Sequence, residues 1–186
     1  ACLLEDPIDL FYFCGFSPSA GTLFISPQKT VLFVDSRYIA AAKQKQTIEV
    51  VLKEQFRDFL LGEKITSIAF DSAKTSVESW QQKTKEFTGI KWINVPFLTK
   101  TLRVIKDEDE QKKMRNAADL SKKAFRCAIE ELKEGVSELE IAWIYEKYCR
   151  EHGAEKLSFT PIVAFGENSA FPHHRASKRK LKNNEV

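Results

Sequence analysis

The side chains best suited to chemistry are two adjacent histidines, His173 and His174, in the stretch SAFPHHRASKRKLKNNEV. Imidazole titrates near neutral pH, so a histidine held on a stiff loop is a candidate for proton transfer or substrate binding. Pro172 fixes its own backbone angle and pushes Phe171 toward an extended conformation, which stiffens the segment. Neighbouring side chains of an extended segment point in different directions, so we expect at most one of the two histidines to be functional. The alternative is that both are exposed loop histidines.

The remaining polar candidates are weaker. His152, in EHGAE, follows a helical segment, where an imidazole favours the negative end of the helix dipole, so we interpret it as structural. The basic run after the histidine pair has no interleaved aromatic residue and no nucleic-acid module around it, so we favour a solvated loop and expect no nucleic-acid partner. The sequence has no GxSxG, HExxH, P-loop or GxGxxG motif. The residues alone therefore do not provide a complete active site.

Composition limits the class of protein. A chain of 186 residues with 43% hydrophobic residues is typical of one or two globular domains, and 29 basic against 26 acidic residues give a net charge of only +3. The four cysteines form no CxxC pair, which favours reduced thiols in a cytosol. No apolar run approaches the ~20 residues that span a bilayer. We therefore expect a cytoplasmic protein that does not bind membranes.

The first hundred residues alternate strand and helix patterns, which predicts an α/β layer structure. The short turn segment SPQKT predicts a hairpin, so the sheet should be mixed. A helix is expected over 37–44, capped by Asp35 or Ser36, and another over 75–87, with Val77, Trp80, Thr84 and Phe87 facing the sheet. The strands are expected at residues 2–4, 21–26, 30–35, 47–52, 67–72 and 90–95.

Two long helical segments follow, and we place a domain boundary between residues 101 and 102. The first helix is expected from Asp107, with Glu110 completing its cap, to about residue 134, and the second from Ser137, with Glu140 as its capping partner, to Gly153. Residues 158–166 are expected to form a strand and the terminal NNEV a turn into another strand. The apolar faces of the two helices need a sheet to cover them, which predicts that residues 102–186 are only part of a domain. The faces comprise Met114, Ala118, Phe125, Ala128, Ile129, Leu132, Ile141, Ile144, Tyr145 and Tyr148.

The whole chain resembles the Xaa-Pro aminopeptidase and prolidase group of the creatinase-like, pita-bread metallopeptidases. In the first half, DPIDLFYFCGFSPS and TLFIS…TVLFVDSRY are similar to family segments. In the second half the similar segments are LRVIKDEDEQKKMRNAADLS, EGVSELEIA, GAEKLSFTPIVAFGENSAFPHH and LKNNEV. The ordered series in the second half is the more specific evidence. The resemblance implies a creatinase-type N-terminal domain at 1–101, a mixed sheet flanked by helices, and an incomplete pita-bread α+β catalytic domain at 102–186.

The resemblance also assigns roles to the two histidines. His173 matches the family's histidine after this proline, which lies beside the metal centre and hydrogen-bonds the substrate or transition state. His174 occupies the next position, where members vary, and is carried over only as a substrate-binding candidate. We therefore expect His173 to be catalytic and His174 to contribute to substrate binding.

The cofactor is likewise implied by the resemblance. Family members build a dinuclear metal centre from two Asp, one His and two Glu, all beyond the segment that matches LKNNEV. Oxygen-rich ligation suits Mn²⁺, and related sites accept Co²⁺ or Zn²⁺. None of these ligands is present here, so we expect two divalent ions in a full-length parent and none in this chain. The sequence opens on ACLLE without an initiator Met, and we expect it to be shortened at both ends.

Two functional hypotheses remain open. In the first, the chain is a fragment of a metal-dependent Xaa-Pro peptidase, of aminopeptidase P or prolidase type, that hydrolyses the bond before proline and is inactive by itself. Its partners would be a peptide with proline at the second position and a second copy in a homodimer. In the second, it is a non-catalytic creatinase-like module that binds proteins. The residues that follow LKNNEV discriminate the two, because a module would lack the carboxylates.

Overall fold

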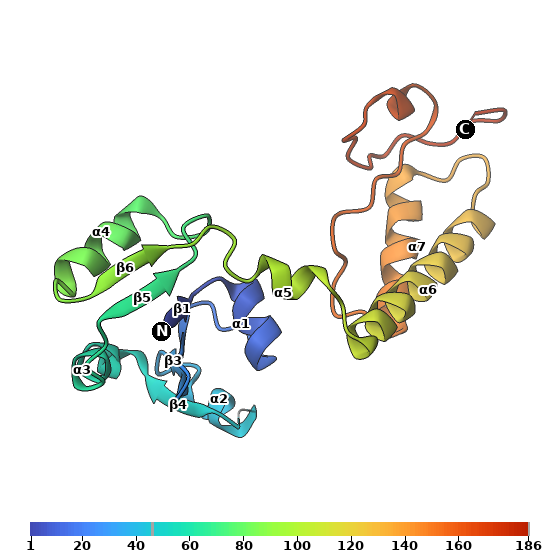
Figure 1. Cartoon of the computed structure of the whole chain (residues 1–186). Coiled ribbons are helices and arrows are strands. Elements are labelled where there is room, and N and C mark those ends of the chain that lie inside the picture. Colours follow the sequence, from blue (N-terminus) through green and yellow to red (C-terminus); the bar gives the residue numbers. More distant parts are fainter. Residues whose placement is uncertain (46, 186) are drawn as a thin grey trace. The chain divides into compact units, whose positions relative to one another are not determined.

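The computed structural model describes residues 1–45 and 47–185, which fall into two compact units divided between Ile105 and Lys106 (Figure 1). The boundary expected from the sequence, between residues 101 and 102, falls within a short helix of the first unit, α5 (Lys100–Val104). We describe each unit separately.

A six-stranded mixed sheet forms the centre of the first unit, with strand order β4-β3-β2-β1-β5-β6. β2 runs antiparallel to both β1 and β3, whereas β1 with β5, β5 with β6, and β3 with β4 pair in parallel. The predicted mixed α/β sheet is thus confirmed, and the SPQKT segment closes the β2–β3 hairpin. The strands are β1 (Cys2–Leu4), β2 (Gly21–Ile25), β3 (Thr30–Val34), β4 (Glu49–Leu52), β5 (Ser67–Phe70) and β6 (Lys91–Asn94).

Side-chain alternation along the strands produces two cores, one on each face of the sheet. Leu3, Phe24 and Phe33 point to one face, where they pack with residues from α3 and the end of α4. Leu4 and Leu23 point to the other face, where they pack with residues from α1 and α2. The helices of this unit are α1 (Pro7–Cys14), α2 (Ile39–Lys45), α3 (Phe56–Gly62), α4 (Val77–Glu86) and α5, with a 3₁₀ turn, η1 (Lys53–Gln55).

Local capping explains where α1 begins and ends. Asp6 accepts hydrogen bonds from the backbone N–H groups of Ile8 and Asp9, Pro7 occupies the first turn, and Gly15 ends the helix with a left-handed φ of 61°. The predicted stripe on α4 is wrong in part. Phe87 is buried, whereas Val77 is 70% exposed and Trp80 41% exposed, because only the end of α4 reaches the aromatic core around β6.

Two helices dominate the second unit, α6 (Glu108–Glu130) and α7 (Glu138–Glu151). Both predicted capping boxes form, between Asp107 and Glu110 for α6 and between Ser137 and Glu140 for α7. α6 ends at residue 130, before the predicted end at 134. No helix in the described ranges is both long and apolar enough to cross a bilayer.

The strand predicted at 158–166 is not formed. Residues 158–165 are irregular, and a 3₁₀ turn, η2 (Gly166–Ala170), follows them. A strand requires a neighbour to accept and donate its ladder hydrogen bonds, and no described strand pairs with this segment. Asn183 and Asn184 form the predicted turn. The strand predicted to follow NNEV lies outside the described residues.

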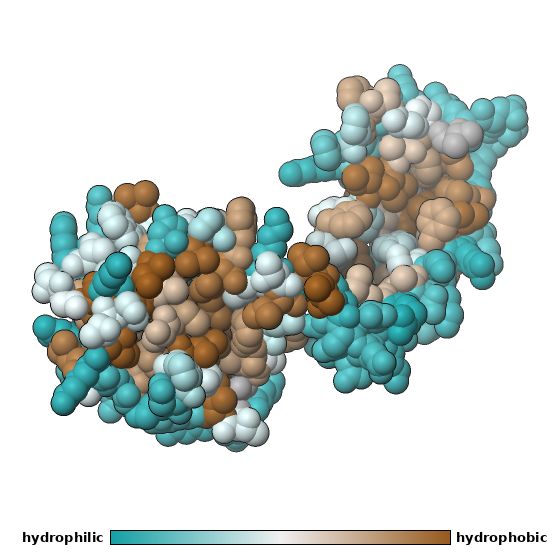
Figure 2. Space-filling model, viewed as in Figure 1, coloured by the Kyte–Doolittle hydropathy of each residue, from teal (hydrophilic) through white to brown (hydrophobic). Residues whose placement is uncertain are grey.

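The unit's hydrophobic core is small, and much of the predicted apolar face is exposed. Among the described residues, its buried cluster consists of Ala128, Val136, Ile141 and Phe165. Phe125 and Ile129 remain exposed beside a groove of about 540 Å³ between α6, α7 and the 157–165 segment. Figure 2 shows brown, hydrophobic residues on both units between teal margins.

Candidate functional site

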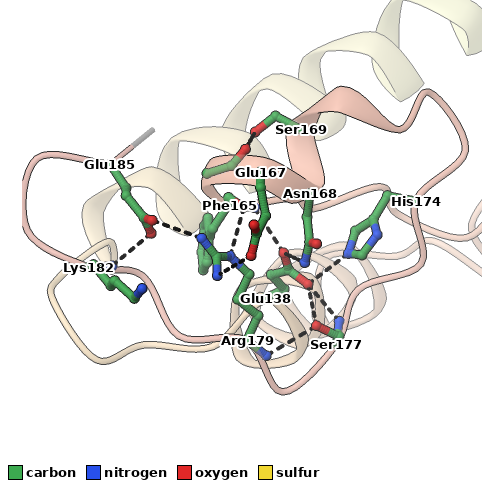
Figure 3. Close-up of polar contacts among 11 residues, drawn as sticks. Glu138, Phe165, Glu167, Asn168, Ser169, His174, Ser177, Arg179, Lys182 and Glu185 are labelled. Atoms are coloured by element: carbon green, nitrogen blue, oxygen red, sulfur yellow. Dashed lines mark hydrogen bonds and ion pairs between the residues drawn. The ribbon is translucent and has the colours of Figure 1, made fainter.

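A buried carboxylate at the start of α7 organises the polar surroundings of the histidine pair. Glu138 is the first helical residue after the cap Ser137, and its side chain is fully buried. The backbone beyond it is held by the returning chain, because the N–H groups of Glu138 and Leu139 donate to the carbonyl oxygens of Arg179 and Ser177. The helix start thereby points this carboxylate into the 165–177 loop (Figure 3).

Glu138 accepts five hydrogen bonds from that loop. Its Oε1 accepts from the Phe165 backbone N–H at 2.9 Å and the Asn168 side-chain amide at 2.8 Å. Its Oε2 accepts from the Ser177 backbone N–H at 2.9 Å, the Ser177 hydroxyl at 2.7 Å and the His174 Nε2 at 2.8 Å. One carboxylate therefore ties both ends of the loop to α7.

These donors keep Glu138 ionised. Burial by itself would raise the pKa of Glu138, but the hydrogen bonds from His174, Ser177 and Asn168 outweigh it and hold the pKa well below its usual range. Because an ionised carboxylate can only accept, the Nε2 atom of His174 must have its proton and donate it to Glu138. His174 is thus the Nε2–H tautomer or the imidazolium.

A second set of hydrogen bonds, made by the Arg179 side chain, also holds the loop. The Arg179 guanidinium donates to the Phe165 carbonyl at 2.9 Å, to Glu167 at 3.2 Å and to Glu185 at 2.8 Å. Arg179 belongs to the basic run for which the sequence predicts a solvated loop. Its side chain is instead largely buried and structural.

The two histidines differ in their surroundings, although they lie at a hydrogen-bonded turn and not in the expected extended segment. His174 is bonded to Glu138, whereas His173 is exposed. Both line an open hollow of about 870 Å³, together with Arg175, aromatic side chains Trp143 and Phe159, and neighbouring residues of α7 and the 159–162 segment. An imidazole beside a guanidinium and aromatic surfaces can hydrogen-bond a peptide and contact its apolar side chains.

The other histidine stays apart from this site. His152 is the C-cap of α7, where its Nδ1 lies 2.8 Å from the Tyr148 carbonyl oxygen and its ring stacks on Tyr148 at 3.9 Å between centroids. This position is the one expected from the helix dipole argument.

Glu138 was not predicted from the sequence as part of a site. An acidic residue in the first turn of a helix is common because it favours the helix dipole, so its type and position gave no signal. The available signal was the ordered similarity of EGVSELEIA to a family segment, which places Glu138 in a matching motif without assigning it a role.

Another buried carboxylate, in the first unit, is structural. Asp9 accepts from the Thr99 hydroxyl at 2.7 Å, Arg103 at 2.9 Å and Lys74 at 2.9 Å, and its side chain is only 1% exposed. These bonds fasten α5 and the loop after β5 to α1.

In the same unit, burial raises the pKa of the Cys14 thiol to about 11, so this thiol is protonated at neutral pH and is a poor nucleophile.

No group of three or more His, Cys, Asp or Glu side chains in the described ranges is arranged to hold a metal ion. Glu138 is saturated by loop donors, and His174 is bonded to it. The described residues therefore do not fit the dinuclear centre that the family resemblance implies, and we assign no step to a metal within them.

Comparison with known families gives two adjacent matches. Residues 1–105 match the creatinase/prolidase N-terminal domain, and residues 112–186 match metallopeptidase family M24. The first match covers more than half of the chain. The chain thus belongs to the creatinase/prolidase family, with an N-terminal domain of that type followed by part of an M24 metallopeptidase domain.

Individual relatives agree with this assignment. The Xaa-Pro dipeptidase of Pyrococcus furiosus is 30% identical over 98% of this chain and 53% of its own length. The structure of the X-Pro aminopeptidase from Thermotoga maritima superposes with a TM-score of 0.90 at 30% identity, over 99% of this chain and 55% of that one. The prolidase from Pyrococcus horikoshii superposes with a TM-score of 0.87 at 28% identity, over 99% and 53%. The chain spans about half the length of these relatives.

Proposed function

We propose that this sequence is part of a metal-dependent Xaa-Pro peptidase, of aminopeptidase P or prolidase type, that hydrolyses the peptide bond before proline. The observation that supports it most is the order of the two family matches, which together extend over nearly the whole chain. The relatives named as X-Pro aminopeptidase and Xaa-Pro dipeptidase align over nearly all of it. The substrate would be a peptide with proline at its second position.

Within this proposal, His173 hydrogen-bonds the substrate or transition state. Its exposure beside the 870 Å³ hollow, on a loop fastened by Glu138 and Arg179, supports that role. Positioned hydrogen-bond donors are most effective when the protein fixes them before the substrate arrives. His174 contributes to substrate binding only through what its Nδ1 side can reach, because its Nε2 proton is used by Glu138.

Two divalent ions, Mn²⁺ or else Co²⁺ or Zn²⁺, belong to the complete protein in this proposal. They would supply an activated water and polarise the scissile carbonyl. Since the described residues do not form a metal site, we propose that the 186 residues alone are inactive. We further propose that the complete protein is a cytoplasmic homodimer without nucleic-acid or membrane partners.

The coding sequence beyond residue 186 in the native source tests the proposal. We expect it to continue in frame with two Asp, one His and two Glu in the order of the family. A continuation without those ligands would favour the second candidate, a non-catalytic module that binds proteins. Metal-dependent Xaa-Pro cleavage by the 186-residue chain itself would contradict the proposed inactivity, because no described ligand set could explain it.

A further inference from the structure

We propose that Glu138 and His174 are positioning residues for His173: the buried carboxylate fixes the 165–177 loop, and the Nε2–H of His174 locks the part of the loop from which His173 projects. The inference rests on the proposed function for the role of His173 in a reaction. The geometry of the pair stands without it.

All the hydrogen bonds that Glu138 accepts from side chains and backbone of the loop run in one direction, from the loop to α7. Glu138 belongs to α7, and every donor it accepts from belongs to the loop, at residues 165, 168, 174 and 177. The carboxylate is fully buried, so water does not compete for these donors. The loop is thereby fastened to a regular helix at four positions, two on each side of the segment 169–173.

His174 provides the fastening nearest to His173. The His174 imidazole is bonded to Glu138 at 2.8 Å, and the His174 backbone N–H donates to the Phe171 carbonyl at 3.1 Å, which closes a turn around His173. Both rings line the hollow, but the His174 ring is held by Glu138 and mostly buried, whereas the His173 side chain is exposed and has its place set by the turn. If His174 only filled space, a side chain of similar size without a hydrogen-bond donor to Glu138 would serve equally well.

Replacing His174 separates positioning from mere packing. His174→Ala removes the donor and leaves the other four bonds of Glu138, so the unit should still fold. His174→Gln places an amide N–H within reach of the same oxygen and serves as the conservative rescue. Ser137→Ala is the matched control, because it removes the cap of α7 and leaves all five bonds to Glu138 in place.

The measurement is backbone ¹⁵N relaxation by NMR on the 186-residue chain, read at the amides of residues 171, 173 and 174, since Pro172 has none. For the unmodified chain we expect order parameters near 0.85, typical of rigid backbone. His174→Ala should lower them below about 0.6, the range of flexible backbone, whereas His174→Gln and Ser137→Ala should leave them near the starting value. Glu138→Gln should lower them at least as much as His174→Ala.

Two results would overturn the inference. One is an unchanged order parameter at His173 in His174→Ala, which would mean that the loop is rigid without the pair. The other is an equal loss in Ser137→Ala, which would mean that general loosening of α7 is responsible. The readout requires no hydrolysis, so a protein without Xaa-Pro activity would refute the proposed function and leave this result standing.

A kinetic arm extends the test to the complete protein. With His173 displaced by about 1 Å, kcat/KM for an Xaa-Pro peptide should fall by about 100-fold in His174→Ala, mostly in kcat, and recover in His174→Gln. An equal loss in both variants would contradict positioning by the Nε2–H donor.

Discussion

Exchanging Glu138 for glutamine tests how much the second unit depends on one charge. The carbonyl of the new amide can still accept from the Phe165 N–H and the Asn168 side chain. Its NH₂ group would face three donors that now point at the Oε2 atom of Glu138, two from Ser177 and one from His174. The shape of the side chain is almost unchanged, so the difference isolates charge and hydrogen-bond polarity.

The expected loss of unfolding free energy depends on whether each of these three donors can find another partner after the substitution. The Ser177 hydroxyl can rotate, and the His174 side chain, 15% exposed, can turn toward water or change tautomer. The Ser177 backbone N–H cannot move away, and an unsatisfied buried N–H costs about 1–3 kcal/mol. Adding about 1 kcal/mol for each of the two charge-assisted bonds lost gives about 3–5 kcal/mol, within the range for breaking a buried ionic group.

Urea denaturation followed by the fluorescence of Trp143 measures this loss. Trp143 lies in α7, and replacing Trp80 and Trp92 of the first unit by Phe in every variant leaves it as the sole reporter. Glu140→Gln is the matched control: it makes the same chemical change two residues away at an exposed capping position, where glutamine can still accept the capping bond. We expect a loss of about 0.3–1 kcal/mol there, from the charge near the helix N-terminus. If the two variants differ by less than about 1 kcal/mol, the reasoning about the buried carboxylate is refuted.

Three further predictions concern pH, the first unit and the exposed apolar surface. The depressed pKa of Glu138 contributes stability that is complete above its unfolded value of about 4.3 and is lost as pH falls through the lower folded value. The difference in unfolding free energy between the unmodified chain and Glu138→Gln should therefore shrink below about pH 4. A difference that grows on acidification would contradict an ionised Glu138. Asp9→Ala should lower the unfolding free energy of the first unit by about 2–3 kcal/mol, as measured by calorimetry. This is less than the full penalty for breaking a buried ion pair, because Lys74 and Arg103 are partly exposed and can reach water. An unchanged melting temperature would contradict a structural role of Asp9. The exposed groove between α6 and α7 should make the 186-residue chain bind apolar dyes and self-associate, and a clean monomer without dye binding in ultracentrifugation would contradict this.

Periodicity and capping were sufficient to predict much of the fold. Strands with alternating burial, such as β5, and helices with a capping box, such as α6 and α7, are specified within a few residues of sequence. The helices α1 and α3 were not predicted as such, because short, largely apolar segments show no clear helical period. The strand at 158–166 failed for a different reason: β structure needs a pairing partner, and local pattern cannot supply one.

The site was predictable only in part. The pair His173 and His174 was visible from residue type, and its two members have different surroundings, because His174 is bonded to Glu138 whereas His173 is exposed. Their roles stay predictions. The bond from His174 to Glu138 spans 36 positions and joins a helix start to a loop, so no local pattern could predict it. The buried contacts of Arg179 could not be predicted for the same reason, because the sequence of a basic run does not indicate which of its side chains is buried.

The most direct test of the central claim is hydrolysis of Xaa-Pro peptides by the complete protein from the native source, with Mn²⁺ added, beside the 186-residue chain as control. We predict cleavage before proline by the complete protein, abolished by a chelator and restored by the metal, and none by the 186-residue chain. Absence of cleavage by the metal-loaded complete protein across dipeptide and longer Xaa-Pro substrates would contradict the account and favour a non-catalytic module.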